Sequence, residues 1–304
     1  MNNLSGLSPV SKHGKLQVNG NRIVDSSGKI VQIRGMSLYW SQWKGKYWNE
    51  DVIGWLVKDW NISVIRLAMA VENGGYLLNP DTETKKVRTA IEAAQKLGIY
   101  IIVDWHDHNA QNHPGAAKKF FKEISSSYYD MPNIIYEIFN EPIKQDWSTE
   151  IKPYAQEITE TIRSSGSSNL IVAGTPRWSQ DVDIAVQDPL NDFNTAYTLH
   201  FYASSHKEWL RQKAQKALDK NFALFVTEWG ACEANGDGYL DKNETAEWLS
   251  FMDKNSLSWC NWSISDMPET SAALKPGADR KGNWQLSDLS ESGLLLRKVL
   301  RDYN

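Results

Sequence analysis

The 304-residue sequence has no surplus of basic residues. It holds 33 lysines and arginines against 37 aspartates and glutamates, which gives a formal net charge of −4. Binding to nucleic acid depends on clustered positive charge that attracts phosphates, and no Lys/Arg block supplies it. The composition therefore argues against a nucleic-acid partner.

Long apolar runs are missing as well. Nowhere do about 18 apolar residues follow one another, the length that a membrane-spanning helix needs. The opening stretch, MNNLSGLSPVSKHGK, also lacks the ~7–15-residue apolar segment of a signal peptide. No membrane association is predicted. A secreted domain whose export signal has been removed and a cytosolic protein would both carry such a sequence.

Cysteine is scarce, and two residues, Cys232 and Cys260, do not make a disulfide framework. Both lie near the ends of neighbouring predicted strands, so one bridge between them is geometrically open. We interpret them as buried thiols, with the single bridge as the alternative.

A G-x-G-x-x-G motif does not follow any early strand, which argues against an open dinucleotide-binding sheet. Instead, short β-rich runs that are apolar on both faces alternate eight times with amphipathic stretches. The predicted strands cover 32–39, 64–70, 100–106, 133–141, 170–176, 195–202, 223–230 and 257–265. The predicted helices cover 50–60, 84–98, 116–128, 151–165, weakly 181–187, 207–220, 244–255 and 290–302.

Eight βα units of roughly 30 residues predict an α/β fold, a single (β/α)8 TIM barrel. The preceding stretch KLQVNGNRIVDSSGKIVQI contains Asn-Gly and Ser-Gly turn signals, typical of a short N-terminal β-hairpin that closes the barrel floor. We expect residues 1–14 to be an N-terminal extension and residues 15–304 to form the catalytic domain, because no linker or repeat separates a second one.

Tryptophan, by contrast, is abundant, with 14 residues. Indoles are large and amphipathic, so such a surplus indicates that some lie at a binding surface while the others belong to the core.

Two glutamates stand out by their position. Glu141 and Glu228 are 87 residues apart, at the ends of the fourth and seventh predicted strands, and barrel active sites lie at the carboxyl ends of strands. A facing pair of carboxyls is the apparatus of glycoside hydrolysis, in which one donates a proton and the other attacks the sugar or activates water. The alternative is that either glutamate only forms a strand-end ion pair.

The roles within this pair follow from the expected surroundings. Phe139 and its aromatic neighbours would raise the pKa of Glu141 by desolvation and suit it to be the acid, whereas Arg66 would keep a nearby carboxylate ionised. Glu137 is a competing candidate, but its deeper position in the strand favours a structural ion pair with Arg66.

A metal centre is the competing chemistry. His106 and His108 form an H-x-H pair of the kind that binds zinc, but a third and a fourth ligand would have to converge from other strands, where His200 and scattered carboxylates are the candidates. We therefore predict no metal and no cofactor.

Six strand-end motifs in order, VIRLAM, VDWHDHN, YEIFNEP, YTLHFYA, FVTEWG and CNWSISD, closely resemble those of glycoside hydrolase family 5 cellulases, over about residues 15–304. The resemblance extends to GTPRWSQDVD (174–183) and ETSAAL (269–274). It implies a retaining endo-β-1,4-glucanase with Glu141 as acid/base and Glu228 as nucleophile.

Further roles come only from this resemblance. Asn140 would bind the sugar 2-hydroxyl, Arg66 and Tyr202 would orient Glu228, and His106 and His200 would hold substrate and Glu141. The implied substrate-binding residues are Trp40, Trp43, Trp178, Trp262 and Glu269. Many relatives carry lysine where this chain has Met267, which has no donor for a distal glucose. Tyr39 and Trp40 stand where some members have His-Gly.

The resemblance implies a β-1,4-glucan substrate, and we expect a monomeric, secreted enzyme whose signal peptide has been removed. A β-mannanase or xyloglucanase would use the same scaffold and the same two glutamates. A carbohydrate-binding protein without turnover and a metal-dependent barrel hydrolase are the alternatives from other classes.

Overall fold

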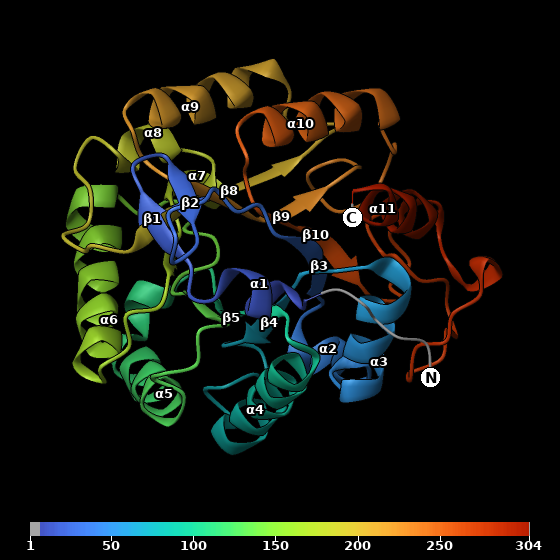
Figure 1. The fold of residues 1–304 in the computed structure, drawn as a ribbon, viewed down its shortest axis with the longest axis horizontal. Coiled ribbons are helices and arrows are strands. Elements are labelled where there is room, and N and C mark those ends of the chain that lie inside the picture. The colour runs from blue at the N-terminus through green and yellow to red at the C-terminus, as the bar shows by residue number, and fades with distance from the viewer. Residues whose placement is uncertain (1–6, 304) are drawn as a thin grey trace.

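The computed structural model describes residues 7–303, and its centre is a closed barrel of eight parallel strands (Figure 1). Each strand from β3 to β9 pairs with the next one along the chain, and β10 pairs with both β9 and β3 to close the ring. The strands are β3 (Arg34–Leu38), β4 (Val64–Ala70), β5 (Tyr100–His106), β6 (Ile134–Glu137), β7 (Ile171–Ala173), β8 (Thr195–Tyr202), β9 (Leu224–Gly230) and β10 (Trp259–Ile264). The predicted (β/α)8 barrel is confirmed.

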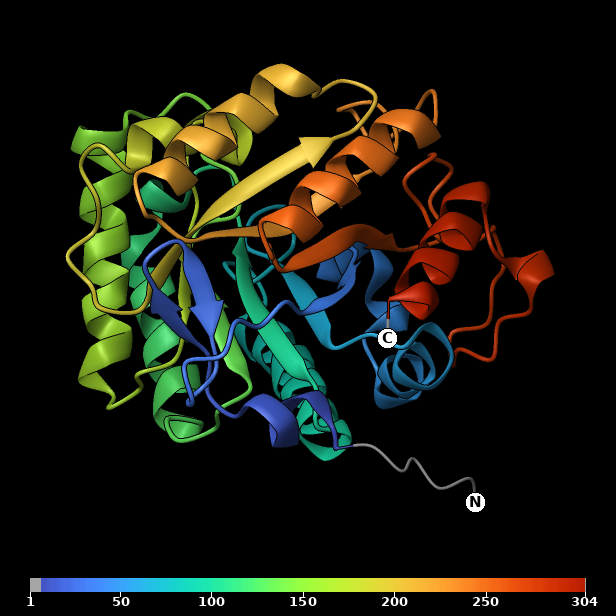
Figure 2. The same cartoon turned by 45° about the horizontal axis from the view of Figure 1, so that its top comes forward.

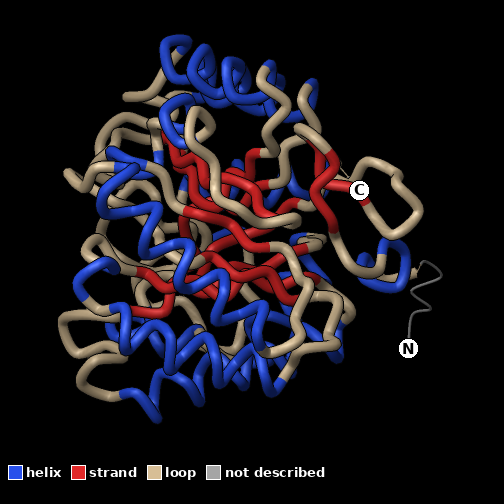
Figure 3. Tube along the Cα trace, turned by 90° about the vertical axis from the view of Figure 1, so that its left-hand side faces the viewer, coloured by secondary structure: helices blue, strands red, loops and turns tan. Residues whose placement is uncertain are grey.

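Helices surround the barrel, so that the strands form an inner cylinder (Figures 2 and 3). They are α1 (Pro9–His13), α2 (Ser41–Lys44), α3 (Glu50–Trp55), α4 (Pro80–Leu97), α5 (Pro114–Ser127), α6 (Lys152–Ser164), α7 (Pro176–Ser179), α8 (Val182–Ala185), α9 (Glu208–Asp219), α10 (Lys242–Lys254) and α11 (Glu291–Asp302). Local signals set their ends: Asp241 and Ser290 cap α10 and α11 by accepting backbone N–H bonds. Across residues 7–303, every helix is too short or too polar to cross a membrane.

The predicted hairpin is present at the amino end of the strands. Strands β1 (Gln17–Asn19) and β2 (Arg22–Val24) pair antiparallel. Leu16 and Ile23 pack into one buried cluster with barrel residues such as Val64 and Tyr100. The hairpin therefore closes the floor, and the opposite rim, where the strands end, is left for a site.

Two predicted elements differ from the structure near that rim. The strand predicted over 133–141 ends at Glu137. The next residues still lie between β5 and β7, since Ile138 N–H donates to Val172 O and Glu141 N–H to Asp107 O, but they form no regular ladder. The backbones are so close there that a Cβ on Gly174 would come 2.2 Å from the Phe139 carbonyl oxygen. The weak helix predicted over 181–187 is only the single turn α8, preceded by α7 with non-helical residues inside it.

Both cysteines are buried free thiols, as predicted, and the alternative disulfide is absent. Tryptophan divides as expected between core and surface. Only Trp43, Trp178 and Trp209 are exposed, and the other eleven are buried or half-buried.

Candidate active site

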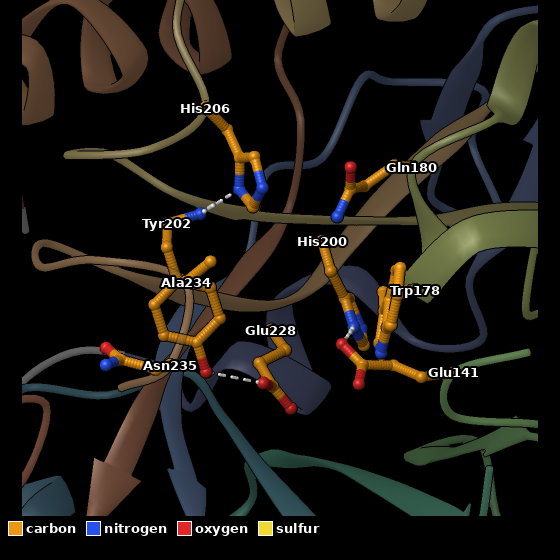
Figure 4. Close-up of a pocket in the computed structure, with 9 residues that line it drawn as sticks. All are labelled: Glu141, Trp178, Gln180, His200, Tyr202, His206, Glu228, Ala234 and Asn235. Carbon is orange, nitrogen blue, oxygen red and sulfur yellow. Dashed lines mark hydrogen bonds and ion pairs between the residues drawn. The ribbon is translucent and has the colours of Figure 1, made fainter. Parts of the chain in front are cut away.

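Glu141 and Glu228 face each other at the carboxyl end of the barrel (Figure 4). Glu228 is the fifth residue of β9, and Glu141 lies in the bent segment that follows β6. One carboxylate oxygen of each lies within 4.8 Å of the other. Both line a cavity of about 490 Å³, so the predicted pair shares one site.

Arg66 is the fixed charge beneath this pair. Its guanidinium is fully buried and lies 2.7 Å from Glu137, 2.9 Å from Asp104 and 3.0 Å from Glu228. It also donates to Asn140 Oδ1 at 2.6 Å. The predicted ion pair between Arg66 and Glu137 is present, and it leaves Glu141 and Glu228 as the carboxyls at the cavity.

Glu228 is held from both sides. Arg66 Nη1 donates to Oε2, and the Tyr202 hydroxyl donates to Oε1 at 2.7 Å. Burial and the nearby charge of Glu141 raise the pKa of Glu228, while His200 and Arg66 act in the opposite direction. The two bonds leave the carboxylate one orientation, which suits a nucleophile.

Glu141 does not have the surroundings that the sequence suggested. Phe139 packs away from it, with its ring 5.4 Å from Tyr154 of α6. Two imidazoles contact Glu141 instead: His200 Nδ1 lies 2.9 Å from Oε1 and His108 Nε2 lies 3.3 Å from Oε2. Burial by itself would raise the pKa of Glu141, but these imidazoles outweigh it and lower the pKa, so the expected upward shift is wrong for the free enzyme.

The proton positions on His200 follow from its partners. Thr227 donates its hydroxyl proton to Glu137 Oε1 at 2.7 Å, so the same hydroxyl accepts from His200 Nε2 at 2.9 Å. Burial opposes a charge on His200, yet the bonds to Glu137 and Glu141 raise its pKa to about 9. Below that pH a second proton lies between His200 Nδ1 and Glu141.

His106 borders the cleft together with Glu141 and Glu228, but its imidazole bonds to Asp104 and does not hold Glu141. Its Nδ1 lies 2.6 Å from Asp104, and its ring stacks on Trp262 at 5.4 Å and 5°. Burial and then the Arg66 charge lower the pKa of His106, which keeps it neutral. His108, to which sequence reasoning gave no such role, makes the second contact with Glu141.

Aromatic rings line one arm of the cleft. Tyr39, Trp40 and Trp262 border a second cavity of about 180 Å³ that shares Glu141 and Glu228 with the first. Trp43 continues this row outward, 5.2 Å from Trp40, and is 53% exposed. The aromatic residues predicted for this side are thus brought together.

Polar groups at the same arm include Glu269, which borders this cavity and accepts a bond from the Ser271 hydroxyl at 2.9 Å. Met267 packs on the small cluster of Tyr39 and Trp262 and offers no donor.

The other arm is formed by Trp178, Gln180 and His206. Trp178 is 44% exposed and lies in a turn in which Arg177, Trp178 and Ser179 all have positive φ, between 53° and 56°. Such backbone is strained for non-glycine residues and persists only where neighbours hold it.

Two bonds hold this turn to the catalytic segment: the Trp178 N–H donates to Pro142 O at 2.8 Å, and the Ser179 hydroxyl donates to Asn140 O at 2.7 Å. Trp178 was expected here from the sequence, whereas Gln180 and His206 were not, because their one signal is a position beyond the ends of strands.

The sequence offered His106 and His108 as a possible metal-binding pair, but the structure groups other residues. Across residues 7–303, the one group of three or more ligand atoms within 4.8 Å is Glu141, His200 and Glu228. His106 and His108 do not make such a group, because His106 faces Asp104 and His108 faces Glu141.

Comparison with known proteins agrees with this geometry. Residues 24–268 match the family model described as cellulase (glycosyl hydrolase family 5). The chain is 45% identical over 297 residues to "Endoglucanase N" of Pectobacterium atrosepticum, covering 96% of this chain and 67% of that protein. It is equally identical to "Endoglucanase 5" of Pectobacterium carotovorum, of which it spans 59%. The chain thus corresponds to about two thirds or less of these curated relatives.

Solved structures match over nearly their full length. A Cytophaga hutchinsonii protein has a TM-score of 0.97 and 50% identity, with 98% of this chain and 97% of that one covered. The catalytic domain of a Thermobifida fusca endoglucanase in complex with cellotetraose has a TM-score of 0.93 and 33% identity, with 97% of this chain and all of that one covered.

Proposed function

Since the chain belongs to the cellulase family, glycosyl hydrolase family 5, we propose that it hydrolyses internal β-1,4 bonds of cellulose-type glucans with retention of the anomeric configuration. The chain is a glycoside hydrolase; its endo-acting specificity for β-1,4-glucan and the roles of its residues make up the proposal.

The distance between the two carboxyls supports retention of the anomeric configuration. Inverting glycosidases keep their carboxyls about 6.5–9.5 Å apart to admit a water, whereas retaining enzymes bring them to about 5–5.5 Å. Oxygens of Glu141 and Glu228 within 4.8 Å of each other leave no room for that water and support direct attack.

In the first step Glu228 attacks C1 of the sugar and forms a glycosyl ester, while the glycosidic oxygen takes a proton from Glu141 and leaves as an alcohol. In the second step Glu141 removes a proton from water, and the resulting hydroxide displaces Glu228 from C1. Arg66 and Tyr202 oppose the upward shift of the Glu228 pKa, which favours its ionised form, and they orient it in both steps.

The proton for the first step is stored on the Glu141–His200 pair. In the free enzyme it resides mainly on His200, because the pKa of Glu141 is lowered and that of His200 is raised to about 9. A substrate that fills the cleft removes water from Glu141, which favours the neutral carboxyl and moves the proton to the oxygen that must donate it.

The two arms of the cleft divide the substrate between them. Trp43, Trp40 and Trp262 form the aromatic arm that fits the glycone, since flat pyranose faces stack on aromatic rings. Trp178 flanks the arm that takes the leaving group. We assign Asn140 to the 2-hydroxyl of the sugar that is cleaved; its Oδ1 accepts from Arg66, which holds its amide in place.

The location of the enzyme follows from the size of its substrate. A polymeric glucan does not cross a membrane, so we expect secretion and a monomer that meets the polymer outside the cell. Activity confined to the soluble cell fraction of the producing organism, with none in the medium, would contradict this.

A substrate panel tests the proposal. Soluble β-glucan, mannan, xylan and xyloglucan are incubated with the enzyme, and NMR reads the anomer of the first product. We expect fastest release from β-1,4-glucan, by internal cuts, with a β product. A preference for mannan or xyloglucan would reassign the substrate, and an α product would refute retention.

Two controls address the other classes. Treatment with EDTA is expected to leave the rate unchanged, and a loss restored by zinc would favour a metal-dependent hydrolase. Binding of all four polymers without turnover would favour a carbohydrate-binding protein.

A further inference from the structure

Trp209 is an exposed tryptophan that has no part in the proposed mechanism. Of the 14 tryptophans, the three exposed ones are Trp43, Trp178 and Trp209. The first two lie at opposite arms of the cleft. Trp209, 44% exposed, has the same exposure as Trp178.

Its position continues the leaving-group arm. Trp209 is the second residue of α9, which follows the carboxyl end of β8, so it lies at the catalytic rim. Its ring meets that of His206 edge to face, at 5.7 Å and 79°. His206 lines the catalytic cavity together with Trp178 and Gln180 (Figure 4). One imidazole therefore separates Trp209 from the cavity.

The two exposed indoles of this arm, Trp209 and Trp178, are both linked to Asp181. Lys213 lies over the Trp209 ring, with Nζ 5.4 Å from its centroid, and also pairs with the buried Asp181. Asp181 pairs in turn with Arg177 at 2.6 Å, in the turn that carries Trp178. Helix α9 and the Trp178 turn are thus connected by charge, and both indoles are held in place before any ligand arrives.

The His206 imidazole offers a hydrogen-bond donor beside Trp209. The backbone N–H of Tyr202 donates to His206 Nδ1 at 2.8 Å. Burial lowers the pKa of His206 to about 4, so the ring is neutral and its proton is on Nε2. Within residues 7–303 that N–H has no hydrogen-bond acceptor. An indole face beside an unused donor is the pairing that a sugar needs, because its C–H face stacks while its edge hydroxyl accepts.

We propose that Trp209 is the platform of a distal subsite, which stacks a sugar of the leaving-group portion of the glucan beyond the unit at Trp178. The subsite rests on the proposed function, since it binds the same chain that Glu141 and Glu228 cut. It extends recognition to longer chains and favours cuts that leave a longer reducing-end product.

Substitution at Trp209 tests this through chain length. Trp209→Ala and the parent enzyme are compared on a series of cello-oligosaccharides, with kcat/KM and the cleavage position measured for each. We expect no change on the shortest substrates, and on chains long enough to pass Trp178 a loss of roughly 3- to 10-fold with cleavage shifted towards other bonds. Trp209→Phe keeps a ring and is expected to restore most of the loss.

Phe193→Ala is the matched control. Phe193 is 68% exposed and has the Arg163 guanidinium 4.7 Å from its ring, but it precedes the amino end of β8, at the opposite end of the barrel. Its substitution is expected to leave the whole series unchanged.

The outcomes separate the subsite from the function. Equal kcat/KM for Trp209→Ala and the parent on the longest chains, or an equal loss on short and long ones, would overturn the subsite while the parent still cleaves the series. A parent that cleaves no cello-oligosaccharide would refute the proposed function and the subsite with it.

Discussion

His200 and Glu141 are joined at 2.9 Å between Nδ1 and Oε1, and the other nitrogen of His200 donates to Thr227. Because the pKa of one partner is raised and that of the other is lowered, the pair carries one proton over a wide pH range. Under the proposed mechanism the proton donor of the resting enzyme is therefore this pair and not a lone carboxyl.

The pH profile of the enzyme therefore depends on His200. A raised histidine pKa means that the proton is present below it, so kcat/KM is expected to fall as the pH rises through about 9. His200→Asn leaves Glu141 to hold the proton alone, and we expect the alkaline limb to move down by about one pH unit or more. His113→Asn, which removes an imidazole paired with Glu72 outside the cleft, is the control. Superimposable limbs for His200→Asn and the parent would contradict the shared proton.

Glu228→Gln keeps the volume of the side chain and removes the nucleophile. We expect hydrolysis to fall by on the order of 10³-fold or more, with oligosaccharide binding by calorimetry nearly intact. Glu247→Gln, on the exposed face of α10, serves as the comparison. Activity within about tenfold of the parent would refute the assignment.

Glu141→Ala removes the proton donor and leaves Glu228 in place. Substrates with poor leaving groups are expected to lose far more rate than activated aryl glycosides, which need no proton to depart. Hydrolysis of both kinds is followed side by side. A uniform loss on both would count against an acid role.

Trp262 is only 5% exposed, because His106 and Tyr39 cover most of it. Trp262→Phe is expected to weaken oligosaccharide binding by about 0.5–1.5 kcal/mol, measured by calorimetry in the Glu228→Gln background. Trp259→Phe, at a fully buried indole of the same strand, is expected to lower thermal stability without changing binding. If Trp262→Phe binds the oligosaccharide as tightly as Trp259→Phe does, Trp262 belongs to the core.

Arg66 neutralises buried carboxyls as well as orienting Glu228. Arg66→Met leaves Asp104, Glu137 and Glu228 without their cation, and we expect about 3–5 kcal/mol to be lost from the free energy of unfolding in urea at neutral pH. Lys118→Met breaks an exposed pair with Glu157 and is expected to cost at most about 1 kcal/mol. A similar small cost for Arg66→Met would contradict this role.

Much of the barrel could be predicted because its strands are buried on both faces and therefore appear as continuous apolar runs. The predicted bounds of β4, β5 and β8 agree with the structure residue for residue. The strand-end rule also located Glu141 and Glu228, since every parallel strand of a barrel delivers its carboxyl end to one rim.

The electrostatics of Glu141 could not be predicted, because they depend on an irregular segment that follows β6 and on imidazoles from two other strand ends. Beyond Glu137 the two-residue alternation of β6 no longer holds, so the sequence did not show that Phe139 turns outward while Asn140 contacts Arg66. His108 keeps the parity of His106 and faces the same cavity, but the sequence offered it only as a metal ligand. Trp209 was missed for another reason: it lies in a regular helix whose pattern marks it only as exposed.

The turn at Arg177–Ser179 also bears on how such an enzyme diversifies. Three successive left-handed residues tolerate few replacements, and the turn supports both Trp178 and the segment that carries the acid. Natural selection or a laboratory library can vary this turn only within narrow bounds. Trp209 lies on ordinary helical backbone, which tolerates exchange more readily. If the proposed subsite holds, the reach of the enzyme along a glucan can therefore change separately from its chemistry.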